Sequence, residues 1–176
     1  MANPFILTAV LPPDIQSWSE GLRRAHYPAH RNHLHAHVTM FHSFAPSLLD
    51  ELKDFIPQIT REFAAPPAQI SGIMDLGTGT AIALASPDLL ELRALIAEHF
   101  HGALTEQDLY EPRPHITIQN KVTKREARAL QAALGLEVEL RADRGPFVFP
   151  ALELHLYMGG PWELLKRSAF RGQARL

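Results

Sequence analysis

Two stretches of this sequence share one pattern, a histidine and a threonine separated by an apolar residue. They are His37-Val38-Thr39-Met40 and His115-Ile116-Thr117-Ile118. Residues two apart in a β-strand project to the same side. Each stretch therefore predicts a strand with His and Thr on one face and apolar residues on the other. Both stretches precede a helix-start signal, so a strand–helix unit occurs twice, which indicates two similar lobes facing each other across a cleft.

A pair of histidines in one cleft fits general acid–base catalysis. The ordinary pKa of histidine lies near neutral, and of two close histidines one tends to stay neutral while the other is protonated. The neutral one can take a proton from a nucleophile, and the charged one can give a proton to a leaving oxygen. Threonine hydroxyls can donate hydrogen bonds to phosphate oxygens. We therefore expect His37 and His115 to be catalytic and Thr39 and Thr117 to bind phosphate, with no metal.

The rest of the chain alternates between strand and helix signals. Strands are predicted at 5–10, 35–44, 68–76, 78–85, 114–122, 136–140, 147–158 and 162–170. Four helices are predicted, the first from residue 13 to 24. The second follows a Ser47 cap and is kinked or broken at Pro57, and the third starts at Pro87 after a Ser86 cap. The fourth runs from a Thr123 capping box to a stop at Gly135. Gly159-Gly160-Pro161 predicts a hairpin turn. The interleaved elements indicate an α+β fold with mainly antiparallel sheets, in one domain over residues 1–176.

Composition excludes several kinds of chemistry. The 176 residues are 46% hydrophobic and 20% charged, an ordinary globular balance. There is no cysteine, which excludes disulfides, thiolate metal ligands and a thiol nucleophile. The absence of cysteine fits a reducing compartment, and we expect a cytoplasmic location.

Charge and hydropathy narrow the expected partners. The formal net charge of −2 lacks the basic excess that a long nucleic-acid duplex requires, so a nucleotide or a single RNA end is the better candidate. No apolar run approaches the roughly 20 residues that cross a bilayer, and no signal peptide is recognisable. We expect no membrane association and a monomer.

The two motifs and their surroundings resemble the 2H phosphoesterase superfamily, and within it the bacterial 2′-5′ RNA ligase and cyclic phosphodiesterase-like proteins. The stretches that carry the resemblance are residues 34–44, 113–118 and the closing strand pair within 154–170. The resemblance implies a bilobal α+β fold, with two mainly antiparallel sheets, helices on their outer faces and pseudo-twofold related lobes around a central cleft. It also implies action on 2′,3′-cyclic nucleotide or RNA-end phosphates, or cleavage and formation of 2′-5′ linkages, without a cofactor.

Three further residues are candidate substrate contacts. Lys121 shares the face of His115 and Thr117 on the predicted strand 114–122, so it could reach a phosphate. Arg113 lies just before that motif. Tyr157 is predicted on a strand face where it could stack on a base. Each also fits an ordinary solvated or structural residue.

Two other interpretations stay open at this point. His33, His35 and His37 alternate, so on an extended strand they would point to one side and could form a metal-dependent hydrolase site. That site would need a further ligand, and it leaves Thr39 and the second motif unexplained. The other interpretation is a non-catalytic nucleotide or RNA-end binding module, which would need phosphate donors but not two titrating groups.

Overall fold

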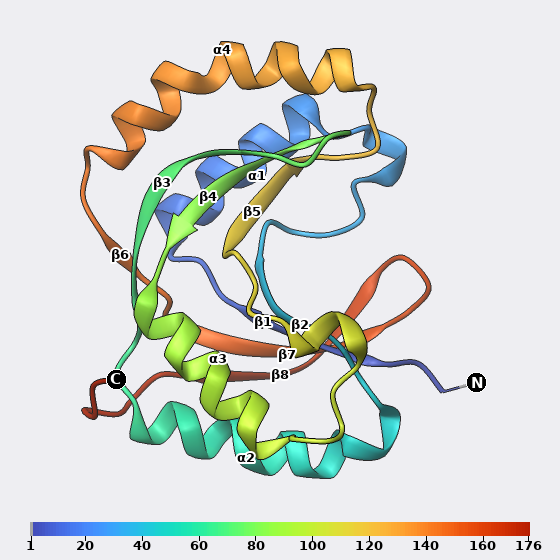
Figure 1. Ribbon diagram of the computed structural model, residues 1–176, viewed down its shortest axis with the longest axis vertical. Helices are drawn as coiled ribbons and strands as arrows, with labels where there is room; N and C mark the ends of the chain where they lie inside the picture. The colour runs from blue at the N-terminus through green and yellow to red at the C-terminus, as the bar shows by residue number, and fades with distance from the viewer. Residues whose placement is uncertain (1) are drawn as a thin grey trace.

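The computed structural model, which describes residues 2–176, has two lobes, each built on a four-stranded antiparallel sheet (Figure 1). The strand orders are β2-β1-β7-β8 and β5-β4-β3-β6. The elements are β1 (Phe5–Ala9), α1 (Pro13–His26), η1 (Ala29–Arg31), β2 (Val38–Phe44), η2 (Pro46–Leu48), α2 (Leu49–Glu62), β3 (Pro67–Asp75), β4 (Thr80–Ala85), α3 (Pro87–His99), η3 (Glu106–Leu109), β5 (His115–Gln119), α4 (Lys124–Ala142), β6 (Phe147–Val148), β7 (Ala151–Tyr157) and β8 (Trp162–Ala169). The η elements are short 3₁₀ helices.

The order strand–helix–strand–helix occurs twice, as β1-α1-β2-α2 and as β4-α3-β5-α4. The first helix of each unit crosses to the other lobe. Helix α1 packs on β5, whereas α3 stacks on α2 through the His99 and Phe55 rings, whose centroids are 3.6 Å apart (Figure 1). The strand that follows each crossing helix carries one His-x-Thr motif. The expected α+β fold with two related lobes is confirmed.

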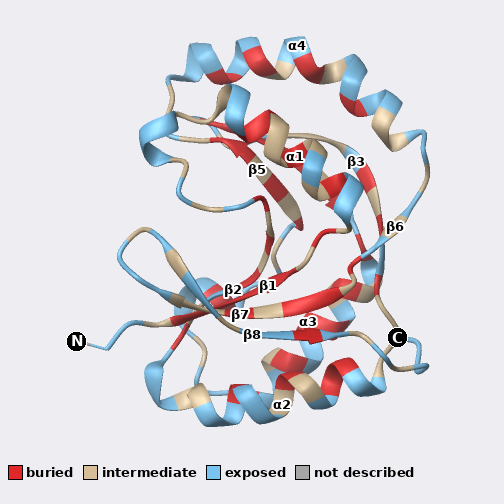
Figure 2. Ribbon diagram, turned by 180° about the vertical axis from the view of Figure 1, so that it is seen from behind, coloured by how far each residue is buried: buried red, intermediate tan, exposed pale blue. Residues whose placement is uncertain are grey.

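The core follows from strands that are buried on both faces. All five residues of β1, which lies between β2 and β7, are buried (Figure 2). The exposed faces of α2 and α4 form opposite ends of the molecule (Figure 2). The edge strands β2 and β5 contact each other, so the two motif strands meet where the lobes meet.

Strand β2 begins at Val38, three residues later than expected. The preceding segment is held by α1 instead of a neighbouring strand. The Ala36 N–H donates to Glu20 Oε1 over 2.6 Å, and the Ala36 carbonyl accepts from Gln16 Nε2 over 2.9 Å. Because α1 supplies these partners, residues 35–37 leave the ladder and the predicted strand alternation of His33, His35 and His37 does not exist.

Helix α2 runs unbroken through Pro57, and Ser47 does not cap it. A proline inside a helix removes the hydrogen bond to the carbonyl four residues earlier. That carbonyl, of Lys53, accepts from Lys166 Nζ of β8 over 3.3 Å. The cation replaces the missing donor. The predicted Ser47 cap is wrong because η2 occupies residues 46–48 and the helix starts after it.

The predicted strand at 136–140 is wrong, since these residues extend α4 to Ala142. The capping box at Thr123 is present, but Gly135 lies inside the helix. The buried residues on α4 recur at helical spacing; they are Ala127, Leu130, Leu134 and Val138. Leu136 and Leu140, which suggested alternation, are 68% and 60% exposed. A short apolar pattern fits both the two-residue period of a strand and the 3.6-residue period of a helix. Here the segment is helical because it packs on β3 and β4.

Residues 147–158 form two strands in different sheets rather than one. β6 pairs with β3 in the second sheet, and β7 pairs with β1 in the first. Pro150 lies between them and has no N–H for a ladder. The chain therefore crosses from one lobe to the other here. The hairpin turn at Gly159-Gly160-Pro161 joins β7 to β8 as predicted. Among residues 2–176, no helix has the length and hydropathy needed to span a membrane.

Candidate active site

The two motifs have the alternating burial that their sequences predict. Val38 and Met40 are 1% and 2% exposed, and Ile116 and Ile118 are fully buried. The histidine and threonine of each motif are half-buried on the opposite face. The apolar residues fix each strand in the core, and this holds the polar pair toward the junction of the lobes. His37 itself lies just before β2, while His115 is the first residue of β5.

The two histidines make the same hydrogen bond. His37 Nδ1 lies 2.7 Å from the carbonyl oxygen of His35, and His115 Nδ1 lies 2.7 Å from the carbonyl oxygen of Arg113. A carbonyl oxygen only accepts, so Nδ1 carries the proton in each ring. In a neutral ring the other nitrogen, Nε2, is then the basic one. Both imidazoles are thus fixed in the tautomer that leaves Nε2 for proton transfer.

The electrostatic environment favours a neutral His37. Burial lowers its pKa from 6.5 to about 4, against an opposing contribution from the His35 carbonyl. The positive charges of Arg23, His155 and His115 lower it further. His37 is therefore uncharged at neutral pH.

Two buried arginines connect the two strand–helix units at the motifs. Arg23 of α1 is 3% exposed and donates through Nη1 to the Thr117 carbonyl over 2.7 Å. Arg93 of α3 is 6% exposed and donates through Nε to the Met40 carbonyl over 3.0 Å. Each crossing helix thus holds the motif strand of the facing unit by its backbone. The sequence pattern did not single out either arginine, because their partners are distant carbonyls.

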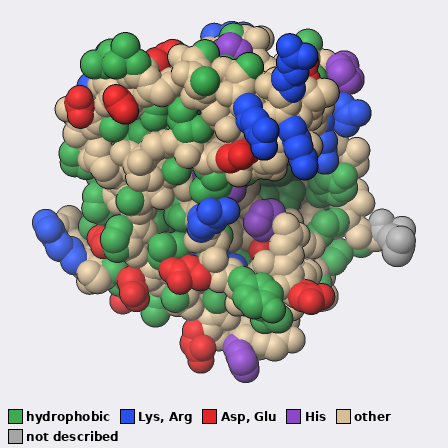
Figure 3. Space-filling model, turned by 45° about the horizontal axis from the view of Figure 1, so that its top comes forward, with side chains coloured by type: hydrophobic (Ala, Val, Ile, Leu, Met, Phe, Trp, Pro, Cys, Tyr) green, Lys and Arg blue, Asp and Glu red, His purple; other side chains and the backbone are tan. Residues whose placement is uncertain are grey.

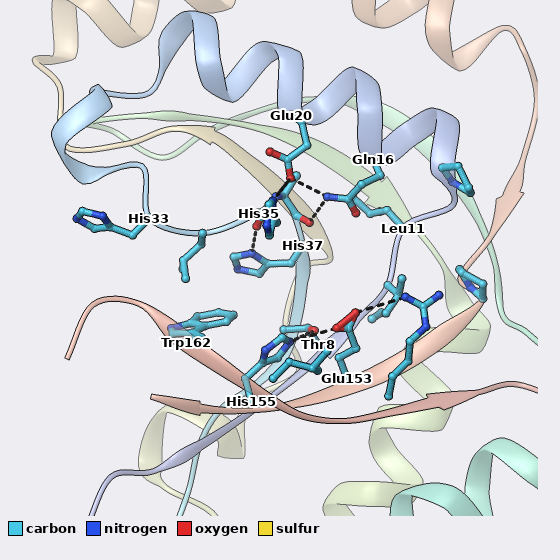
Figure 4. Close-up of a pocket in the computed structure, with 18 residues that line it drawn as sticks. Thr8, Leu11, Gln16, Glu20, His33, His35, His37, Glu153, His155 and Trp162 are labelled. Atoms are coloured by element: carbon cyan, nitrogen blue, oxygen red, sulfur yellow. Dashed lines mark hydrogen bonds and ion pairs between the residues drawn. The ribbon is translucent and has the colours of Figure 1, made fainter. Parts of the chain in front are cut away.

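A pocket of about 710 Å³ opens beside His37, between α1 and the strands β7 and β8 (Figure 4). Histidine side chains are visible in a hollow on the face shown in Figure 3, with Lys and Arg side chains gathered along one side of it. Trp162 lies against His37, with ring centroids 4.6 Å apart. Glu153 and His155 rise from β7 into the same pocket (Figure 4). Its walls include His37, whereas Thr39, His115 and Thr117 lie outside it.

Of the three candidate substrate contacts, Lys121 lies away from its predicted position, whereas Arg113 precedes β5 and Tyr157 ends β7 as expected. The predicted placement of Lys121 is wrong, because β5 ends at Gln119 and Lys121 is exposed in a turn with φ of 60°. Arg113 contributes its carbonyl to His115, while its side chain is exposed. Tyr157 is 39% exposed at the end of β7, and its cross-strand partner Trp162 is the aromatic residue in the pocket.

The geometry does not favour the metal-dependent alternative. His33 and His35 are exposed, and His35 Nδ1 lies 3.4 Å from Glu20 Oε1. Within residues 2–176, no group of three His, Asp or Glu side chains is arranged to hold a metal ion. His33 and His35 instead line the mouth of the pocket beside His37 (Figure 4).

The family model described as the 2′-5′ RNA ligase superfamily matches residues 11–159. The chain belongs to this superfamily. Its members are 2H phosphoesterases, so membership supports phosphoesterase activity and an enzymatic role in general terms. The match covers both His-x-Thr motifs and ends at the β7–β8 turn. No curated protein matches the chain by sequence.

Solved structures share the fold of this superfamily member. The protein TT0787 of Thermus thermophilus superposes with a TM-score of 0.64 at 15% identity, covering 97% of this chain and 100% of that one. E. coli LigT complexed with NADP+ gives 0.58 at 13% identity, covering 97% and 99%. Kluyveromyces marxianus Usb1 gives 0.54 at 17% identity, covering 93% and 98%. At these identities the likeness establishes the fold.

Proposed function

We propose that the protein is a metal-independent phosphoesterase that opens 2′,3′-cyclic phosphates of nucleotides or RNA ends, or cleaves and forms 2′-5′ phosphodiester linkages. His37 and His115 act as the acid–base pair, and Thr39 and Thr117 bind the phosphate. The single observation that carries the proposal is the matched hydrogen bonding of the two histidines, each of which keeps Nε2 for proton transfer. A binding module would need no such pair.

The lowered pKa of His37 supports a role for it as the base in the hydrolytic direction. A neutral His37 takes a proton from water as the water oxygen attacks phosphorus. Protonated His115 gives its proton to the ribose oxygen as the bond from that oxygen to phosphorus breaks. The product is a phosphomonoester and a free ribose hydroxyl. Each proton transfer contributes typically about 10²–10⁴-fold in rate. In ligation the 5′-hydroxyl of a second nucleotide takes the place of water: its oxygen attacks phosphorus, the 3′-oxygen leaves with a proton, and a 2′-5′ phosphodiester linkage forms.

A nucleotide-sized substrate agrees with the surroundings of the histidines. The net charge is −2, and the pocket beside His37 has the volume of a small-molecule site. E. coli LigT, which has a similar fold, has been crystallised with 3′-AMP and with ATP. We therefore propose a nucleotide or an RNA end as the substrate, rather than a long duplex.

The test is hydrolysis of nucleoside 2′,3′-cyclic phosphates in EDTA by the wild type, His37→Ala and His115→Ala. His101→Ala, an exposed histidine after α3, is the matched control. We expect metal-free turnover that each motif substitution lowers by at least about 10²-fold and the control leaves unchanged. Near-wild-type turnover of His37→Ala would refute the paired mechanism. Activity only with added zinc or manganese would favour a metal site, and nucleotide binding without turnover would favour a binding module.

A further inference from the structure

The pocket beside His37 continues a row of polar residues that starts at the proposed phosphate site. Thr39 of β2 pairs with Thr8 of β1, Thr8 pairs with Glu153 of β7, and Glu153 pairs with Arg167 of β8. Cross-strand partners project from the same face. Neighbouring strands lie about 4.8 Å apart, so Glu153 lies roughly 10 Å from Thr39 along the sheet. A ribose and base attached to a phosphate at Thr39 extend over this distance.

The walls of the pocket suit a flat aromatic ring. Trp162 lies 4.6 Å from the His37 ring and 5.4 Å from the His155 ring, measured between centroids. Apolar side chains line much of the remaining surface, among them Leu11, Leu34 and Leu164. Nucleobases are commonly bound by stacking on aromatic side chains. The pocket is thus positioned and lined for the base of a nucleotide whose phosphate lies between the motifs.

Glu153 is the carboxylate in this pocket whose two oxygens both lack a hydrogen bond from the described residues, whereas the Glu20 contacts all fall on Oε1. Glu20, on the opposite wall, already accepts from the Ala36 N–H over 2.6 Å and from Gln16 over 2.8 Å. Glu153 Oε1 lies 3.6 Å from Arg167 Nη1, and Oε2 lies 3.8 Å from His155 Nε2. Both separations are too long for hydrogen bonds. The Glu153 side chain is 17% exposed, and burial raises the pKa of its carboxyl group. A hydrogen-bond donor on a bound ligand would replace the hydration that burial removes from this carboxylate.

We propose that this pocket is a guanine subsite, in which the base stacks on Trp162 and donates two hydrogen bonds to the Glu153 carboxylate. An ionised carboxylate only accepts, and its two oxygens match two adjacent N–H donors. Guanine has such a pair on its Watson–Crick edge, N1–H and N2–H₂. Adenine and cytosine place a ring acceptor beside their amino group, and uracil has a single N–H between two carbonyls. The proposal rests on the proposed function, which places the phosphate at the motifs.

Binding of the 3′-monophosphates of guanosine, adenosine, cytidine and uridine, measured by calorimetry with the full chain, tests the subsite without turnover. We expect guanosine 3′-monophosphate to bind about 10- to 100-fold more tightly than the other three. Glu153→Gln should remove this preference. The control is Glu163→Gln, an exposed carboxylate at the start of β8 that lies outside the pocket. Equal binding of the four nucleotides, or a guanine preference that Glu153→Gln leaves intact, would overturn the proposal.

Trp162 provides a second variant that acts on a different part of the base. Trp162→Ala should weaken binding of all four nucleotides about tenfold or more, whereas Trp162→Phe should retain a stacking ring and most of the affinity. Guanine preference in a protein that acts on neither cyclic phosphates nor 2′-5′ linkages would leave the subsite standing and reject the proposed function. Hydrolysis of all four cyclic phosphates at equal kcat/KM, with no binding preference, would support the proposed function and reject the guanine subsite.

Discussion

Arg23 of helix α1 donates a hydrogen bond of 2.7 Å to the carbonyl oxygen of Thr117, in the middle of the second motif. Its Nε donates to Asn32 Oδ1 over 3.1 Å, and its guanidinium lies 4.4 Å from the centre of the Tyr27 ring. Burial lowers its pKa, against the raising effects of Tyr27 and Glu20. A guanidinium stays charged in proteins nonetheless. A buried cation thus holds the backbone of one motif and contributes to the electrostatic field at the other.

Replacing Arg23 by Gln should have two measurable effects. It leaves the partly buried Thr117 carbonyl without its charged donor, so the free energy of unfolding should fall by about 2–3 kcal/mol, as measured by urea denaturation. It also removes a positive charge that lowers the pKa of His37, so that pKa should rise. Arg24→Gln, an exposed neighbour on α1, should do neither. An unchanged His37 pKa in the Arg23 variant would contradict this account.

His37 should titrate far below an ordinary histidine. Burial and the charges around it lower its pKa to about 4, so its ring remains neutral through pH 5 and 6. Proton NMR of the imidazole C2–H during a pH titration measures this directly, and the His37→Gln spectrum identifies the resonance. A midpoint near 6.5 would mean that the His37 ring is well solvated, and it would remove the basis for assigning it as the base.

The same shift predicts how stability depends on pH. Below about pH 6.5 the unfolded chain binds a proton at His37 that the folded protein does not accept until pH approaches 4. Stability contributed by His37 is therefore full above pH 6.5 and falls as the pH drops from 6.5 toward 4. The difference in free energy of unfolding between the wild type and His37→Gln should decrease over this window. A difference that stays constant from pH 7 to pH 4 would show equal pKa values in the two states.

The threonines of the motifs should act on turnover rather than on folding. Thr39→Val and Thr117→Val keep the shape of each side chain and remove the hydroxyl that is proposed to donate to the phosphate. Loss of one such donor costs typically about 10²–10³-fold in kcat. The matched variants Thr39→Ser and Thr117→Ser keep the hydroxyl and should retain most of the activity. If the valine variants hydrolysed cyclic phosphates as fast as the serine variants, the hydroxyls would have no role in catalysis.

Sequence alone predicted the motif strands because their information is local. Alternation of apolar residues with His and Thr determines which face is buried, and burial of Val38 and Ile116 in the structure confirms it. Arg23 and Glu153 could not be found in this way. Arg23 binds a carbonyl 94 residues away, and the position of Glu153 beside Thr8 depends on how β7 pairs with β1. Both depend on tertiary pairing, which no local pattern encodes.

The fold class was predictable from the sequence. The predicted strands that are wrong lie where a local pattern fits two different structures. Residues 136–140 alternate like a strand, yet Leu134 and Val138 are the buried pair and belong to a helical stripe. Residues 35–37 alternate as well, but the Ala36 N–H is held by Glu20 of α1. In each case packing against a distant element decides between the two.

Two glycines allow this interpretation of α4 and of the second sheet to be tested through stability. Gly135 lies inside α4, and a Cβ added there would meet no atom within 4 Å. Gly135→Ala should therefore stabilise the protein by about 0.5–1 kcal/mol, because glycine loses more conformational entropy in a helix than alanine does. That gain corresponds to a rise in Tm of roughly 1–4 °C for a chain of this size. Gly79 is the opposite case, since a Cβ there would lie 2.2 Å from the carbonyl oxygen of Gln119 at the end of β5. Gly79→Ala should lower Tm in the same thermal scan, and a lower Tm for Gly135→Ala would mean that α4 ends before residue 135.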